Sequence, residues 1–308
     1  MTGFVFPGQG SQAVGMGKSL YESSTDARAM LERLDSVMDG ALLPLCLEGP
    51  DEALRDTRNA QPAIYAVSCA AWAAARAAGV DAEMTAGHSI GEYAALVAAG
   101  VLEPEEGLRL VRVRAEAMAE AAARAPGAMA AVLGLDAETV DTVCSGVDGI
   151  VGAANLNCPG QVVISGATDA VAAAGDALKA AGAKRVVPLA VSGAFHSPLM
   201  RDAAVRLSEC LAGAELAAAR IPVVANVTAD FEREPAEIVS NLVAQVPGRV
   251  RWTESVERMR LAGCDRFIEC GHGTVIAGLV RKIVPGVDVV SVGDAESLAR
   301  LLEGAGAS

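Results

Sequence analysis

The chain has 308 residues, and hydrophobic residues make up 52% of them, enough for a large core. The formal net charge of −13, with no dense basic face, argues against binding to nucleic acid. Apolar runs fall short of the roughly 20 residues that span a membrane, and the first ten residues lack the pattern of a signal peptide. We therefore expect a cytoplasmic protein with neither nucleic-acid nor membrane partners.

The cysteines are scattered and odd in number. They form neither a Cys-x-x-Cys pair nor a Cys/His pair at metal-ligand spacing, so we expect reduced, mostly buried thiols and no metal site. The seven are Cys46, Cys69, Cys144, Cys158, Cys210, Cys264 and Cys270.

In the first 125 residues the apolar pattern predicts a short strand and a series of helices. Residues 3–6 form a short apolar run before Pro7 and Gly8, which predicts a buried strand that ends in a turn. A long Ala-rich segment follows Pro62, and we place this proline in the first turn of a helix. The helices expected in this part are 14–38, 63–78, 90–99 and 108–125.

The pattern changes after Pro126 and Gly127. Strands are expected at 128–133, 149–154, 162–165 and 185–190, and helices at 137–144 and 167–181. This β-α-β-β-α-β order is that of a ferredoxin-like unit. Further strands are expected at 223–225 and 267–269. We predict a large α/β domain, residues 1–125 and 192–308, with a small α+β domain, residues 126–191, inserted into it.

A candidate nucleophile lies in Gly87-His88-Ser89-Ile90-Gly91, which fits the G-x-S-x-G pattern. In that pattern the serine occupies a sharp turn between a strand and a helix, and the flanking glycines avoid Cβ clashes. The amides at the start of the following helix point toward the hydroxyl and toward an oxyanion formed beside it. Ser89 is therefore the predicted nucleophile.

A serine hydroxyl needs a general base, and the chain has three histidines. His88 adjoins Ser89 on a tight turn, where neighbouring side chains diverge, so we expect a structural role for it. His196 lies in a loop between a predicted strand and a predicted helix, where catalytic groups are often placed. His272 also follows a predicted strand. The residues alone favour His196 over His272 only slightly.

Four separate motifs carry a resemblance to a known family. They are Gly8-Gln9-Gly10-Ser11-Gln12, Gly87-His88-Ser89-Ile90-Gly91-Glu92-Tyr93, Asn155-Leu156-Asn157-Cys158-Pro159-Gly160-Gln161 and Gly193-Ala194-Phe195-His196-Ser197. In order and spacing the chain resembles the malonyl-CoA:acyl-carrier-protein transacylases and the acyltransferases of polyketide synthases. The resemblance implies an α/β-hydrolase-like large domain with a ferredoxin-like insertion.

The resemblance also implies roles for individual residues. Ser89 and His196 correspond to a catalytic dyad that needs no carboxylate. Arg114 corresponds to the arginine that pairs with the free carboxylate of the substrate, a task suited to the planar guanidinium. We read Arg109 and Arg112 as ordinary surface arginines. The remaining matches are Gln9 and Ile90 for the backbone oxyanion hole, and Asn155 and Asn157 beside the cleft.

The implied reaction is ping-pong transfer of malonyl from malonyl-CoA to the phosphopantetheine thiol of an acyl carrier protein, without a metal or redox cofactor. Phe195 and Ile90 favour malonyl over methylmalonyl or another carboxylated extender, which is the alternative. We expect a monomer. Because carriers are acidic, docking requires a local basic patch. Candidates are Lys179, Lys184, Arg185, Arg281 and Lys282.

Two departures from the family pattern bear on the site. Many members orient the histidine through a main-chain carbonyl of a glutamine before a tryptophan, whereas here Arg251 precedes Trp252. Many members also have proline where this chain has His272. One rival hypothesis is a thioesterase or esterase that uses Ser89, His272 and Asp265. Another is a non-catalytic carrier-binding module.

Overall fold

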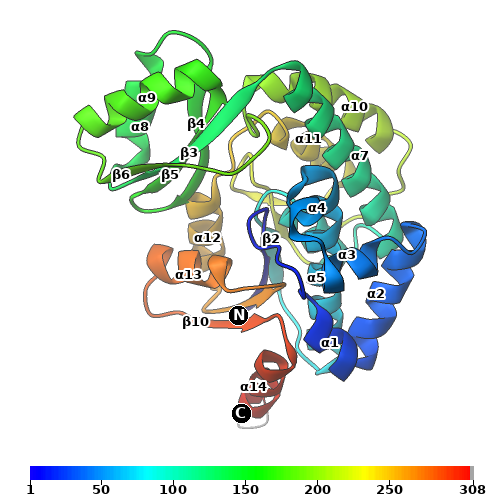
Figure 1. Ribbon diagram of the computed structural model, residues 1–308. Coiled ribbons are helices and arrows are strands. Elements are labelled where there is room, and N and C mark those ends of the chain that lie inside the picture. Colours follow the sequence, from blue (N-terminus) through cyan, green and yellow to red (C-terminus); the bar gives the residue numbers. More distant parts are fainter. Residues whose placement is uncertain (306–308) are drawn as a thin grey trace.

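The computed structural model describes residues 1–305 and contains two β-sheets, each packed against helices (Figure 1). The larger sheet has six strands in the order β10-β9-β1-β2-β7-β8, and the smaller has four in the order β4-β5-β3-β6. This arrangement confirms the predicted fold class, a large α/β unit with a smaller α+β unit.

The larger sheet is parallel except at β8, which pairs antiparallel with β7. Its middle strand β1 is buried on both faces, as expected of a parallel strand covered by helices on each side. The strands are β1 (Thr2–Phe6), β2 (Met84–Gly87), β7 (Val223–Val224), β8 (Phe231–Glu232), β9 (Arg266–Cys270) and β10 (Asp288–Val292).

Helices cover both faces of this sheet. Those from the first part of the chain are α1 (Lys18–Ser23), α2 (Thr25–Val37), α3 (Leu42–Glu48), α4 (Asp51–Arg55), α5 (Thr57–Ala77), α6 (Gly91–Ala98) and α7 (Pro104–Arg124). Those from the last part are η1 (Pro198–Met200), α10 (Arg201–Leu211), α11 (Pro235–Gln245), α12 (Trp252–Leu261), α13 (Val275–Ile283) and α14 (Ala295–Ala305). None of these helices is both long and apolar enough to cross a bilayer.

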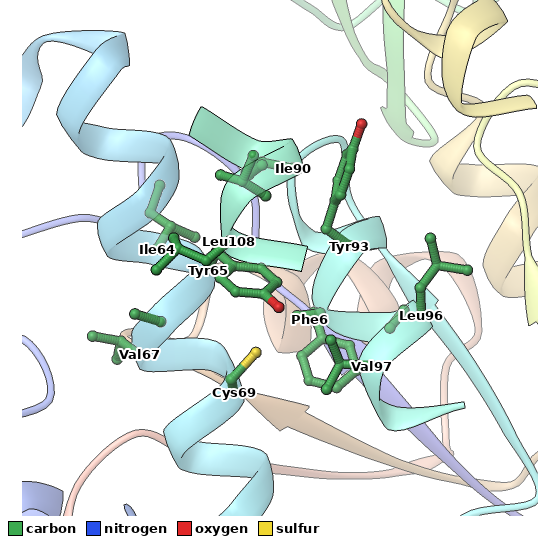
Figure 2. Packing of buried hydrophobic residues seen from close by; sticks show 14 of the residues in the cluster. Phe6, Ile64, Tyr65, Val67, Cys69, Ile90, Tyr93, Leu96, Val97 and Leu108 are labelled. Atoms are coloured by element: carbon green, nitrogen blue, oxygen red, sulfur yellow. The ribbon is translucent and has the colours of Figure 1, made fainter. Parts of the chain in front are cut away.

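The core around α5 and α6 supports the turn that carries Ser89. Figure 2 shows Phe6 of β1 between Tyr65 and Cys69 of α5 on one side and Leu96 and Val97 of α6 on the other. Many of the remaining contacts along α5 are made by alanine, which lets helices and sheet approach closely. The start of α6 is therefore fixed by packing on two sides.

Two helix predictions are wrong in their bounds. The helix expected over 14–38 is broken at Ser24, whose hydroxyl accepts the amide of Ala27 at 3.2 Å and so starts α2 as a separate helix. Helix α5 begins at Thr57 behind its N-cap Asp56, so Pro62 lies inside the helix and not in its first turn. Burial of the helix outweighs the loss of one backbone hydrogen bond at this proline.

The smaller sheet has a hydrophobic core of its own beneath α8 (Ala137–Ser145) and α9 (Thr168–Ala180). Its strands pair antiparallel, and Figure 1 shows both helices on the outer side. The strands are β3 (Gly127–Leu133), β4 (Val151–Cys158), β5 (Gln161–Ala167) and β6 (Arg185–Pro188). The β-α-β-β-α-β order agrees with the sequence, and the boundaries at 126 and 191 stay a prediction.

A short backbone contact joins the two units. The amide of Leu156 donates to the carbonyl of Val250 at 2.9 Å, and the amide of Val250 donates to the carbonyl of Ala154 at 2.8 Å. Strand β4 is thus held against the segment between α11 and α12. This contact fixes one wall of the cleft that contains Ser89.

Candidate active site

Ser89 occupies a sharp turn between β2 and α6. Its φ of +52° lies in the left-handed region, which a non-glycine residue adopts only where its surroundings enforce it. A Cβ at Gly87 would collide with the backbone of Gly91, and a Cβ at Gly91 would lie 2.5 Å from the carbonyl oxygen of Phe6. Both glycines of the motif are therefore required by close backbone approach.

His196 lies within hydrogen-bond distance of the serine. Its Nε2 is 2.7 Å from Oγ of Ser89. Its Nδ1 is 2.9 Å from the carbonyl oxygen of Gln245 and 3.1 Å from that of Gly248. Because a carbonyl oxygen only accepts, the proton is on Nδ1, and the lone pair of Nε2 faces the serine hydroxyl. This is the tautomer that a general base needs.

The carbonyl expected to orient the histidine is a different one. The family pattern pointed to the residue before Trp252, which is Arg251, whereas in the structure the carbonyls of Gln245 and Gly248 contact Nδ1 of His196. The guanidinium of Arg251 pairs with Glu254 and donates to the carbonyl of Thr228. The presence of Arg251 where many family members have glutamine therefore does not alter the orientation of His196.

Burial keeps His196 neutral. Desolvation, with a smaller contribution from the positive charge of Arg114, lowers the pKa of His196 to about 3. The imidazole is only 7% exposed, so the loss of water around the charged form is the dominant cause. At neutral pH the free protein thus holds this histidine ready to accept a proton.

Arg114 projects from α7 into the same site and is 2% exposed. Its Nη2 donates to Oγ of Ser89 at 3.1 Å and to Oε1 of Gln245 at 2.9 Å, and its Nη1 donates to Oε1 of Gln61 at 2.5 Å. Within residues 1–305 it forms no ion pair with a carboxylate. A buried cation held by neutral groups is a site prepared for an anion.

The neighbouring arginines of α7 differ from Arg114. Arg109 is exposed and pairs with Glu106, while Arg112 donates to the carbonyl of Val37 at the edge of the helix. As expected, neither points to the serine. Only the residue that the family resemblance singled out lies at the site.

The backbone amides expected to form the oxyanion hole belong to Gln9, just after β1, and Ile90, just after Ser89. Across the described part of the chain, no hydrogen bond engages either amide. The amide of Ser89 itself is occupied, because it donates to Oδ1 of Asn226 at 2.6 Å. The arrangement fits the predicted pair of donors, whose role stays a prediction.

A cavity of about 330 Å³ lies between the two units and contains the dyad. We call it the acyl cavity. The side chain of Phe195, 4% exposed, forms part of its wall. It is lined by Gln9, Gly10, Gln12, His88, Ser89, Ile90, Arg114, Met118, Met129, Asn155, Asn157, Val163, Leu189, Ala190, Val191, Phe195 and His196. Every residue predicted for the site from the sequence is among them.

The two asparagines play different parts. Oδ1 of Asn157 lies 2.9 Å from Nε2 of His88, so Asn157 holds that half-buried ring, which also packs edge-on against Trp252. His88 is thus a structural histidine, as expected. Asn155 lines the acyl cavity and is 6% exposed.

The residues of the rival hydrolase hypothesis are not brought together. His272 lines a separate hollow of about 500 Å³, with Asp294 and Arg281. Asp265 accepts from the N-terminal ammonium of Met1 at 2.9 Å and is 66% exposed. In residues 1–305, no hydrogen bond links Ser89 to either one.

Three buried amide side chains were missed by the sequence analysis. Gln61, Gln245 and Asn226 are each fully buried and hydrogen-bonded to Arg114 or to the backbone around Ser89. Two of them lie in helices, and none belongs to a motif quoted above. Isolated amides within apolar segments were the available signal. The residues that the structure describes include no cluster of three or more His, Cys, Asp or Glu side chains able to hold a metal ion.

A parallel sheet that presents a serine–histidine pair beside a buried guanidinium defines an enzyme of the serine acyl-transfer class. Comparisons with known proteins agree. The model of the acyl transferase domain matches residues 3–294. The chain belongs to the acyl transferase family, in the branch that contains the malonyl CoA-acyl carrier protein transacylases.

Relatives of known sequence match over almost their full length. The malonyl CoA-acyl carrier protein transacylase of Bacillus subtilis is 44% identical over 96% of this chain and 94% of its own. The Staphylococcus aureus enzyme of the same name is 40% identical over 94% of this chain and 95% of its own.

Solved structures agree equally well. The acyl-carrier-protein S-malonyltransferase of Bartonella henselae superposes with a TM-score of 0.95, is 41% identical and covers 99% of both chains. A malonyl transacylase in complex with its type II polyketide synthase acyl carrier protein has a TM-score of 0.94 and 42% identity, covering 98% of this chain and 99% of that one.

Proposed function

We propose that this protein transfers a malonyl group from malonyl-CoA to the phosphopantetheine thiol of an acyl carrier protein. The observation that carries the proposal is the buried guanidinium of Arg114, which has no carboxylate partner among residues 1–305 and whose Nη2 lies 3.1 Å from Oγ of Ser89. A malonyl thioester bound at Ser89 would place its free carboxylate, whose carbon is two bonds from the thioester carbonyl carbon, beside this cation. The names of the relatives point to the same substrate and acceptor.

The first half-reaction acylates Ser89. His196 takes the hydroxyl proton on Nε2 while Oγ attacks the thioester carbon, and the oxyanion accepts from the amides of Gln9 and Ile90. The tetrahedral intermediate then collapses, and His196 gives the proton to the departing thiolate of coenzyme A. The carbonyls of Gln245 and Gly248 stabilise the transient imidazolium through Nδ1.

The second half-reaction runs these steps with a different thiol. The carrier's phosphopantetheine thiol gives its proton to His196, and its sulfur attacks the carbonyl carbon of the acyl-serine. The bond to Oγ of Ser89 then breaks, His196 returns the proton to Oγ, and the carrier leaves as the malonyl thioester. One thioester replaces another, so the chemistry needs neither a metal nor a redox cofactor. The oxyanion donors contribute most of the stabilisation, since loss of one such donor typically costs about 3 kcal/mol.

Phe195 supports malonyl over methylmalonyl. Its buried ring forms part of the wall of the acyl cavity, next to His196. From the family resemblance we infer that this ring fills the space that an α-methyl group would need. A single methyl is worth only about 1–3 kcal/mol of discrimination, so the effect is a preference. Methylmalonyl or another carboxylated extender is the alternative substrate.

Transfer in fatty-acid or in polyketide biosynthesis is compatible with this site. One structural relative was solved with a type II polyketide carrier, and the relatives named after malonyl CoA and acyl carrier protein specify no pathway. The cytoplasmic location, the monomeric state and the basic docking patch stay predictions from the sequence.

The experiment is a transfer assay with radiolabelled malonyl-CoA and a holo acyl carrier protein. The proposal expects label on the carrier, dependent on both Ser89 and His196, and little release of free malonate. A His272→Ala variant separates transfer from the rival hydrolase. If that variant lost acylation while His196→Ala kept it, the assignment of the base would be overturned. A protein with no labelled intermediate would favour the non-catalytic module.

A further inference from the structure

Gln245 contacts three reactive residues at once. It is the last residue of α11 and is completely buried. Its carbonyl accepts from Nδ1 of His196 at 2.9 Å. Its side-chain Oε1 accepts from Nη2 of Arg114 at 2.9 Å, and its Nε2 donates to the main-chain oxygen of Ser89 at 3.1 Å. The first contact needs only the backbone, whereas the other two depend on the side chain.

The charge of Arg114 is left uncompensated by these contacts. The acceptors on its Nη1 and Nη2 are the amide oxygens of Gln61 and Gln245 and the hydroxyl oxygen of Ser89, none of which carries a net charge. The two amide oxygens orient the guanidinium as a carboxylate would. Burial and the proximity of Glu232 raise the pKa of the nearby carboxyl of Glu92, which favours its neutral form beside Arg114.

We propose that Gln245 is a positioning residue for acyl-group specificity. Its neutral side-chain amide orients the guanidinium of Arg114 toward the acyl cavity and leaves the positive charge free to pair with the free carboxylate of the substrate. The inference rests on the proposed function. A glutamate here would aim the guanidinium equally well but would pair with it. An apolar side chain would leave the positive charge of Arg114 free but would not orient its guanidinium.

Two substitutions separate these effects, and both keep the main-chain carbonyl that orients His196. Gln245→Glu adds a negative charge against Arg114, so a malonyl carboxylate must compete with an internal partner. It also sets an oxygen against the main-chain oxygen of Ser89, which slows every acyl group alike. Gln245→Met removes both side-chain hydrogen bonds without adding charge. The readout is therefore the ratio of kcat/KM for acylation by malonyl-CoA to kcat/KM for acylation by acetyl-CoA. Effects common to all acyl groups cancel in this ratio.

The experiment measures acylation of Ser89 by malonyl-CoA and by acetyl-CoA, using rapid quench and intact mass, and compares kcat/KM values. Gln245→Glu is expected to lower the malonyl to acetyl ratio at least about tenfold, the low end for coupling between buried charges. Gln245→Met lowers the ratio by less. Gln61→Glu, which contacts Arg114 but neither Ser89 nor His196, reproduces the fall.

Asn241→Asp is the matched control. Asn241 is a buried amide on the same helix, one turn earlier, and it donates to Glu232 at 2.7 Å instead of contacting Arg114. Its substitution adds a carboxyl group to the same helix at a position that does not contact Arg114, so the ratio should stay within about twofold of the wild type.

Equal losses of kcat/KM for malonyl-CoA and acetyl-CoA in Gln245→Glu would overturn the inference. Gln245 would then serve only to orient Ser89 and His196. If Gln245→Glu does not fold, Gln245→Met decides: a lowered ratio supports the inference, and an unchanged ratio overturns it. Failure of the proposed function is seen separately, in the wild type, as acylation without any preference for malonyl over acetyl.

Discussion

Arg114→Ala removes the cation that the account assigns to the malonyl carboxylate. The guanidinium is 2% exposed and held by neutral acceptors, so the carboxylate would meet a desolvated charge. Truncating one partner of such a buried pair costs about 2–5 kcal/mol. A value near 3 kcal/mol corresponds to a loss of ~150-fold in kcat/KM for malonyl transfer.

Acetyl transfer should respond differently. An acetyl group has no second carboxylate, and Arg114→Ala removes a positive charge that depresses the basicity of His196. Acetyl transfer is therefore expected to be spared or improved. The assay compares kcat/KM for malonyl-CoA and acetyl-CoA with one carrier protein. Arg109→Ala is the control, since Arg109 lies exposed on the same helix and pairs with Glu106. Equal losses for the two acyl groups would refute the assigned role of Arg114.

Three further predictions concern titration and the rival base. Because the pKa of His196 is lowered to about 3, kcat/KM for acylation should stay level from about pH 8 down to about pH 5; a fall centred near the ordinary histidine pKa of ~6.5 would contradict this. Burial and the neighbouring Glu232 raise the pKa of Glu92, so this carboxyl binds a proton more tightly in the folded state. The stability that it confers should therefore decline as pH rises from its unfolded pKa of ~4.5 through the raised pKa of the folded state. Glu92→Gln should flatten that decline in denaturant midpoints measured across the range, and an unchanged slope would exclude Glu92 as its source. His272→Ala should leave malonyl transfer within about threefold of the wild type, as for surface substitutions, since His272 lines a separate hollow; a hundredfold loss would place it in the mechanism.

The nucleophile, base and cation could be predicted because Ser89 and His196 lie within spaced motifs and Arg114 matches a family position. Ser89 lies between two glycines that close backbone approach requires, and His196 and Arg114 lie at matching positions of the family. The order of elements in the smaller unit could also be read from alternating apolar runs.

The support around the dyad could not be predicted in the same way. The contact that orients His196 is made by the main-chain carbonyls of Gln245 and Gly248, which leave no trace in residue type, so the family pattern pointed to another residue, Arg251. Gln245 and Asn226 come from segments distant in sequence, and only the tertiary fold brings their amides to Ser89. The break at Ser24 and the start of α5 behind Asp56 depend on capping contacts that hydrophobic periodicity does not reveal.

The central claim is that Ser89 carries a malonyl group between two thiols. Intact-mass measurement of the protein mixed with malonyl-CoA, followed by peptide mapping, tests it most directly. The account predicts one malonyl adduct on Ser89 that is absent in Ser89→Ala and discharged when holo acyl carrier protein is added. A protein that stays unmodified, or one modified at another residue, would contradict it.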